Sequence, residues 1–189
     1  MSVIAILLVG LTCSINPAVG GNAMDIHALF ENAERDGRVG IARKSQPVDA
    51  RPAVPGEVVV TIIANEGKET QSRPAAAGDM VVRNRCEATG YEEYLVSAST
   101  FAERYEGPLG PVDAHGWQAY QPRGSDLLYV VLREEDGSFS FTAPWGEEMV
   151  ARPGDAIVRN SADHRDTYRV AAASFECTYE IIKAPDSPK

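Results

Sequence analysis

The chain contains one sequence pattern twice, and this internal repeat constrains its fold more than any other feature. Residues 78–84 read GDMVVRN, and residues 154–160 read GDAIVRN, 76 positions further along the chain. The aromatic residues Phe101 and Tyr105 return as Phe175 and Tyr179, with a spacing of 74 positions. Because a pattern that recurs in register marks a repeated structural unit, we expect two copies of one small fold.

Each copy is predicted to be rich in β-structure. The apolar runs at residues 58–63 and 127–132 predict corresponding buried strands. A Gly-Asp turn then leads into a hairpin, and a short helix follows, whose two aromatic residues share one face and anchor its packing. Residues 143–148 are predicted to be an insertion that only the second copy has. The residues that define the motif are Gly78, Asp79, Phe101 and Tyr105 in the first copy, and Gly154, Asp155, Phe175 and Tyr179 in the second.

The expected fold class is α+β, mostly β. It consists of two tandem copies of a small antiparallel sheet or partly open barrel, each closed by a short helix. A unit of about 65 residues buries too little apolar surface to be stable alone. We therefore expect the copies to pack with pseudo-two-fold symmetry, so that a monomer resembles a homodimer fused into one chain.

The expected organisation along the chain has six parts. They are an apolar N-terminal segment (1–23), a short amphipathic helix (24–40), the first repeat (41–106), a linker (107–110), the second repeat (111–183) and a polar tail (184–189). The N-terminal segment is read as a signal peptide, as sequence upstream of a true start at Met24, or as a packed element. No Lys or Arg precedes its apolar run, and this favours a cytoplasmic location over export to the periplasm.

The second repeat carries the motif in its fuller form, with Arg152-Pro153-Gly154-Asp155 followed by Phe175 and by Thr178-Tyr179-Glu180. This pattern resembles the PGDYG-type family of small bacterial and phage proteins. The first repeat matches less completely because it lacks the proline, and neither repeat has the aromatic residue that usually follows the aspartate. The resemblance covers about two thirds of the chain. It implies a family label and no reaction.

Composition excludes several classes of partner. The net charge is −9 and the pI about 4.8, so the clustered cations that bind nucleic acid or anionic membranes are not expected. His27, His115 and His164 are scattered, and Cys13, Cys86 and Cys177 form no close pair, so neither a metal nor a cofactor is expected. Cys86 and Cys177 could form a disulfide, but semi-buried thiols are the favoured interpretation.

Two charged positions of the motif, an aspartate and an arginine, recur in both copies. Asp79 and Asp155 could act together in general acid–base catalysis if both faced one cleft. The favoured interpretation is that each carboxylate accepts backbone hydrogen bonds in a turn. Arg83 and Arg159 could clamp an anionic ligand, and structural ion pairs with Glu106 or Glu180 or across the two repeats are the competing interpretation.

Three aromatic residues occur in one copy only. Trp117, Tyr120 and Trp145 lie in or near loops and are candidates for ligand or partner recognition, with loop anchoring as the alternative. The favoured function is therefore a non-enzymatic module that binds an unknown small molecule or protein. The alternatives are a small hydrolase or isomerase that uses Asp79 and Asp155 at the cleft between the repeats, and a phage or host accessory protein with a structural or inhibitory role.

Overall fold

The computed structural model describes residues 24–186, so the interpretations of residues 1–23 lie outside the described residues. The described part is mostly β-structure, as expected, with three short helices: α1 (Ile26–Arg35), α2 (Ala98–Arg104) and α3 (Ala172–Thr178). Two 3₁₀ turns, η1 (Glu87–Thr89) and η2 (Glu134–Asp136), interrupt the strands. Within residues 24–186 no helix is both long and apolar enough to cross a membrane.

Ten of the strands form two five-stranded antiparallel sheets with no closed barrel among the described residues. The first sheet has the order β6 (Glu93–Val96), β5 (Met80–Asn84), β2 (Val48–Pro52), β8 (Gln118–Pro122) and β7 (Tyr105–Glu106). The second sheet has the order β13 (Thr167–Val170), β12 (Ala156–Asn160), β9 (Asp126–Val131), β1 (Gly40–Lys44) and β14 (Tyr179–Lys183).

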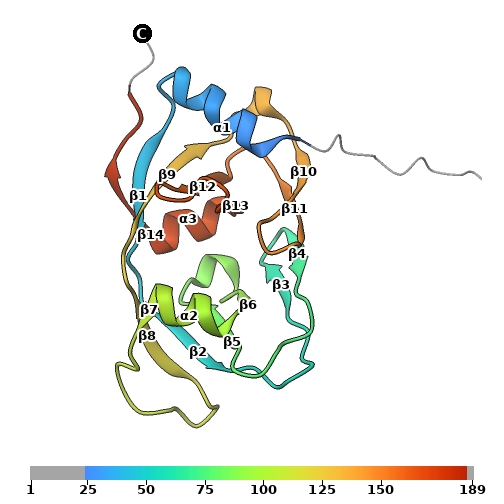
Figure 1. Ribbon diagram of the computed structural model, residues 1–189, viewed down its shortest axis with the longest axis vertical. Coiled ribbons are helices and arrows are strands. Elements are labelled where there is room, and N and C mark those ends of the chain that lie inside the picture. The colour runs from blue at the N-terminus through green and yellow to red at the C-terminus, as the bar shows by residue number, and fades with distance from the viewer. Residues whose placement is uncertain (1–23, 187–189) are drawn as a thin grey trace, which may run out of the picture.

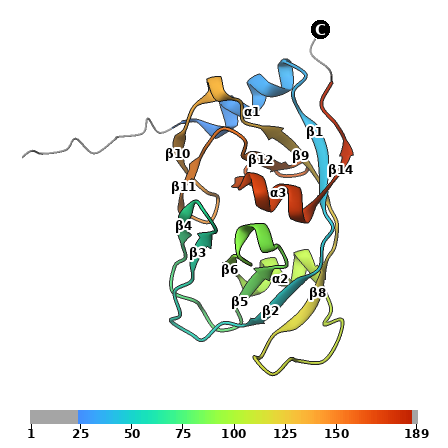
Figure 2. The same ribbon diagram turned by 180° about the vertical axis from the view of Figure 1, so that it is seen from behind.

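Two segments of chain cross from one sheet to the other. β1 belongs to the second sheet and β2, which follows it directly, belongs to the first; β8 belongs to the first sheet and β9 to the second. β1 pairs with β9, and β2 pairs with β8. Each sheet is therefore completed by one strand from the opposite repeat. Figures 1 and 2 show these crossing strands along one side of the molecule, with α2 and α3 in its middle.

The remaining four strands form two hairpins on the opposite side from the crossing strands (Figure 2). They are β3 (Val60–Ile63) with β4 (Gly67–Gln71), and β10 (Phe139–Thr142) with β11 (Glu148–Ala151). Residues 143–148 contain the turn of the second hairpin, and residues 64–66 make the turn of the first. The prediction of an insertion without a counterpart is therefore wrong, since the second copy has a longer turn at an equivalent place.

The predicted correspondence between residues 58–63 and 127–132 is also wrong. β9 lies in the centre of its sheet, between β12 and β1. β3 instead has one solvent-exposed face, which carries Val60 and Ile62. The strand that occupies the place of β9 in the first sheet is β2, between β5 and β8. The β-branched run in β3 reflects strand propensity on a half-exposed hairpin, and propensity alone does not distinguish this from burial.

The predicted local elements are confirmed where short-range chemistry decides them. Asp25 caps α1 by accepting hydrogen bonds from the backbone amides of His27 and Ala28. The buried face of α1 packs on the second sheet and the β10–β11 hairpin. The predicted aromatic pairs also stack, but only their first members lie in the helices. Phe101 of α2 stacks on Tyr105, the first residue of β7, with centroids 4.9 Å apart, and Phe175 of α3 stacks on Tyr179, the first residue of β14, with centroids 5.0 Å apart. These rings join the cores above the two sheets.

Cys86 and Cys177 form a disulfide, with their Cα atoms 5.8 Å apart. The favoured interpretation of free thiols is therefore wrong. Cys86 lies just before η1 and Cys177 lies in α3, and these two elements pack against each other. A separation of 91 residues in sequence concealed this contact.

Candidate ligand-binding site between the two sheets

A cavity of about 540 Å³ lies between the two sheets. Its walls come from both repeats: α2 and α3, the ends of β1 and β6, the β13 strand and both hairpins. Cavities of a few hundred Å³ that combine apolar walls with a few convergent polar groups are typical of small-molecule sites. The site is therefore built at the seam that the crossing strands create.

Lys44, the last residue of β1, points its ammonium group into this cavity. The Nζ atom donates hydrogen bonds to Asn84 Oδ1 at 2.7 Å and to the Tyr94 hydroxyl at 2.9 Å. Burial lowers the pKa of Lys44 to about 8, although the nearby Glu92 carboxylate opposes this shift and Arg104 adds to it. The amine is thus charged at neutral pH but loses its proton far more readily than an ordinary lysine.

The other cations of the cavity wall are already paired. Arg73 contacts Asp79 at 2.7 Å, and Arg104 contacts Asp166 at 2.6 Å. Arg169 is held by three carboxylates. Among the described residues no carboxylate lies within 4.0 Å of Lys44 Nζ, so Lys44 is the lining cation that remains available for a ligand.

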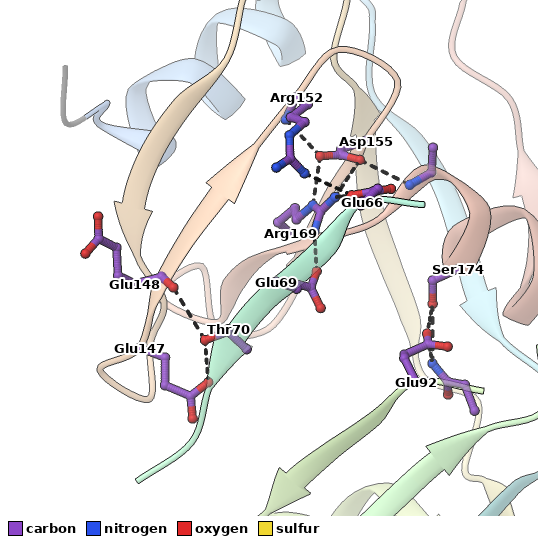
Figure 3. A network of polar contacts seen from close by, with 12 residues as sticks. Glu66, Glu69, Thr70, Glu92, Glu147, Glu148, Arg152, Asp155, Arg169 and Ser174 are labelled. Carbon is purple, nitrogen blue, oxygen red and sulfur yellow. Dashed lines mark hydrogen bonds and ion pairs between the residues drawn. The ribbon is translucent and has the colours of Figure 1, made fainter. Parts of the chain in front are cut away.

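Glu92, Asn84 and Ser174 are polar lining residues next to Lys44, and together they form what we call the polar floor of the cavity. Glu92 is 5 % exposed, and its carboxylate accepts hydrogen bonds from Asn84 Nδ2 at 2.7 Å, from Ser174 Oγ at 2.6 Å and from the Thr89 hydroxyl. Figure 3 shows the contact with Ser174, which comes from α3 of the second repeat. Because Asn84 donates to Glu92 and accepts from Lys44, its amide orientation is defined by its two partners.

Four tyrosine hydroxyls gather around this floor. Tyr94 and Tyr105 from the first repeat lie with their oxygens 3.0 Å apart, and Tyr168 and Tyr179 from the second repeat also line the cavity. Burial raises the pKa of all four phenols, that of Tyr105 to about 12. They therefore stay neutral across the physiological range and offer a ligand both donors and acceptors without adding charge.

Trp145 lies at the rim of the cavity, in the turn between β10 and β11. Its side chain is 46 % exposed, and its ring meets Tyr168 edge-on with centroids 5.5 Å apart. Leu127 and Met149 extend the apolar part of the wall. The cavity wall thus combines the polar group at Lys44 and several paired charges with apolar side chains near Trp145.

A buried network of charges joins the β3–β4 hairpin to the second sheet beside the cavity (Figure 3). The side chain of Arg169 is 0 % exposed, and it contacts both oxygens of Asp155, at 2.7 and 3.0 Å. It also contacts Glu66 at 2.7 Å and the Glu69 carboxylate. Arg169 stands where the first repeat has Leu95, so the network joins an arginine of the second repeat to carboxylates of both repeats.

The structure places Asp79 and Asp155 in two separate turns. Asp79 accepts hydrogen bonds from the amides of Ala76 and Ala98, and Asp155 from those of Arg152 and Ala172. Burial opposes ionisation of Asp79, but the hydrogen bonds from Arg73 and the two amides outweigh it and hold its pKa below the ordinary value. Neither carboxylate lines the cavity, so they share no cleft in which to act together.

Arg83 and Arg159 are likewise kept apart from the cavity. Arg83 pairs with Asp49 at 3.0 Å, rather than with Glu106 or across the repeats. Arg159 is 1 % exposed, lies 4.1 Å from the centre of the Phe30 ring, and has no carboxylate within 4.0 Å among the described residues. Burial lowers its pKa. Both guanidinium groups are thus used in packing.

Of the three loop aromatics, only Trp145 lines the cavity. Trp117 is 7 % exposed, and the guanidinium carbons of Arg51 and Arg83 lie 5.3 and 4.3 Å from the centre of its ring. Tyr120 packs edge-on against Phe101, with centroids 4.9 Å apart. Trp117 and Tyr120 therefore serve as anchors, whereas Trp145 keeps an exposed face at the site.

Sequence reasoning missed most residues of the polar floor. Lys44 begins a segment (44–50) that resembles the opening segment of the PGDYG-type family, but neither Lys44 nor Glu92 has a spacing that would single it out as a site residue. The tyrosines did carry a signal, because Tyr94 and Tyr105 return as Tyr168 and Tyr179, but a recurring aromatic is more often a packing residue. Within residues 24–186 no group of three or more His, Cys, Asp or Glu side chains is arranged to hold a metal ion.

A scan against models of known protein families, a search of curated proteins and a search of solved structures each found no match to this chain. The resemblance to the PGDYG-type family therefore depends on the motif residues alone.

Proposed function

We propose that the protein binds a small organic molecule in the cavity between its two sheets. The observation that carries this proposal is the Lys44 ammonium group, which lines a partly open cavity and has no carboxylate within 4.0 Å among the described residues. A buried cation in this position is costly unless something neutralises it. A ligand with one anionic or carbonyl oxygen would meet this requirement.

The other residues of the cavity wall indicate the charge and polarity of such a ligand. The remaining lining cations are already paired, so additional charges on the ligand would be left without partners. The neutral tyrosine hydroxyls suit hydroxyl or ether oxygens, and Trp145 with Met149 suits an apolar or aromatic group. We therefore expect a compact molecule with one polar end and one apolar part.

We further propose that the two repeats arose by duplication and pack as a pseudo-two-fold pair, so that the monomer corresponds to a fused dimer. The matching order of the two sheets supports this, with β2 and β9 at their centres and β7 and β14 at one edge of each. The PGDYG-type motif in both repeats is a further argument for it. A ligand at the seam would then occupy a site that the pairing creates.

The two alternative functions have no comparable support. A hydrolase or isomerase that uses Asp79 and Asp155 requires both carboxylates in one cleft, and they lie in separate turns. A purely structural or inhibitory role would leave the cavity without a purpose. The binding proposal is therefore the one that uses the features of the seam.

The test is a thermal-shift and NMR screen of small monocarboxylates and carbonyl compounds with aromatic or branched apolar groups. Hits are then titrated against Lys44→Met and against Lys183→Met, whose side chain is exposed and distant in sequence. We expect Lys44→Met to weaken binding at least tenfold and Lys183→Met to leave it unchanged. Equal affinity of a hit for both variants would place its site outside the cavity.

A further inference from the structure

Lys44 differs from the other described lysines in how its amine is surrounded. Lys68 bonds to Gln71 on the surface, and Lys183 is 63 % exposed with Asp186 at 3.9 Å. Only Lys44 directs Nζ into a cavity, and both of its hydrogen-bond partners are neutral. An amine held in this way is oriented toward whatever occupies the cavity.

A lysine becomes a nucleophile only when it is unprotonated. Burial lowers the pKa of Lys44 to about 8, with Arg104 adding to the shift and Glu92 opposing it. At pH 7 the neutral fraction of this amine is therefore about 300-fold larger than that of a lysine at 10.5. The other titratable groups nearby, Tyr94 and Tyr105, remain neutral phenols.

We propose that Lys44 forms an imine with an aldehyde or ketone bound in the cavity. The Nζ lone pair attacks the carbonyl carbon, so that a C–N bond forms and the carbonyl oxygen takes up a proton. The C–O bond then breaks, the oxygen leaves as water with the two protons lost from nitrogen, and no oxidant or reductant is needed. The Tyr94 hydroxyl, 2.9 Å from Nζ, is the positioned group that passes a proton from nitrogen to oxygen.

The surroundings favour this reaction over simple salt formation. Four neutral hydroxyls can bond to a carbonyl oxygen or to the water that leaves. The partial enclosure of Lys44 limits the bulk water that would hydrolyse an imine. Glu92 lies close enough to raise the pKa of Lys44, and its charge also stabilises a protonated imine. This inference depends on the proposed function, because it assumes that the cavity admits a small organic ligand.

The experiment uses the full chain and three matched probes: benzaldehyde, benzyl alcohol and benzoate. The protein is incubated with benzaldehyde and cyanoborohydride between pH 6 and 9, and the benzylated residues are identified by peptide mapping. Lys44→Arg keeps the charge but cannot form an imine, and Lys183→Arg is the surface control. Peptide mapping of the wild-type chain identifies the site even if Lys44→Arg folds poorly.

We expect the rate of labelling at Lys44 in the wild-type chain to exceed that at Lys68 or Lys183 at least tenfold at pH 7. The excess should shrink toward pH 9, as the surface amines also lose their protons. Labelling spread evenly over all lysines would refute imine formation at Lys44. If benzyl alcohol or benzoate still binds in that case, the proposed cavity function stands. If benzaldehyde, benzyl alcohol and benzoate all fail to bind, the cavity does not take this class of ligand. The proposed function is then tested with the wider screen of monocarboxylates and carbonyl compounds.

Discussion

The disulfide between Cys86 and Cys177 offers the sharpest test of how the two repeats are joined. The bridge closes a loop that spans 91 positions of sequence, from the turn before η1 to α3. In the chain-entropy treatment a closed loop of this length lowers the entropy of the unfolded chain enough to stabilise the fold by about 4.5 kcal/mol. This is a large fraction of the roughly 5–15 kcal/mol that stabilises an ordinary domain.

The disulfide can be removed in two ways, by reduction and by substitution of both cysteines. Reduction of the wild-type protein removes the covalent link and leaves both sulfur atoms in place, so it isolates the effect of the bridge. The double variant Cys86→Ser, Cys177→Ser removes the link permanently, but it also places a hydroxyl where the Cys86 side chain is fully buried. We therefore expect the double variant to lose about 1–3 kcal/mol beyond the loss on reduction, because the Ala173 carbonyl oxygen lies 3.7 Å from Cys86 Sγ and would bond a serine hydroxyl there only weakly.

The assay is urea unfolding followed by far-ultraviolet circular dichroism, with and without reductant. The reduced protein should have a lower unfolding midpoint and a steeper m-value, because its unfolded chain exposes more surface once the loop is open. The double variant is the control, and reductant should leave its unfolding curve unchanged. Thiol counting in denaturant before and after reduction checks the starting state, since reduction of the bridge releases two thiols.

The reasoning fails if the oxidised protein, with its bridge verified by thiol counting, unfolds within about 1 kcal/mol of the reduced protein. That result would mean that the unfolded chain already keeps η1 and α3 together. A thiol count that does not rise on reduction would instead show that the bridge does not form.

Three further predictions concern charges and the cavity rim. Arg169→Leu introduces the residue that the first repeat has at the equivalent position, Leu95. It leaves the carboxylates of Asp155, Glu66 and Glu69 without their buried cation and should lower the free energy of unfolding in urea by about 3–5 kcal/mol. Asp79 has a lowered pKa, so its contribution to stability is present above the unfolded value of 3.8 and is lost as pH falls through the lower folded value. Asp79→Asn should therefore flatten the decline of stability below about pH 4, and a decline as steep as that of the wild type would contradict this assignment. Trp145→Ala should change the unfolding free energy by less than about 1 kcal/mol, because its ring is half exposed. The same change should weaken binding of cavity ligands severalfold in a fluorescence or NMR titration, and unaltered affinity would remove Trp145 from the site.

Local chemistry made part of this fold predictable. The spacing of Ile26, Leu29 and Phe30 after the capping Asp25 sufficed to predict α1, because a helix is defined by contacts within a few residues. The Gly-Asp turns were predictable for the same reason, since Gly78 and Gly154 adopt positive φ values of 87° and 91° that side chains disfavour.

The pairing of the strands and the residues of the site could not be predicted from local sequence patterns. Nothing within β1 indicates that it pairs with β9 and β14 instead of continuing into the sheet of β2. The position of Lys44 follows from that pairing, and so does the approach of Ser174 to Glu92. The residues of this site come from distant parts of the chain and lie together only in the folded protein. Local sequence patterns therefore do not predict which of them share the site.

The crossing strands also determine the order in which the chain can acquire structure during synthesis. β1 is made early, but its two partners are β9 and β14, and β14 ends at Lys183. The first sheet likewise waits for β8, which ends at Pro122. A growing chain of one repeat therefore leaves the ribosome with unpaired strand edges, which are prone to aggregation. The second sheet can therefore be completed only after residue 183 has been synthesised.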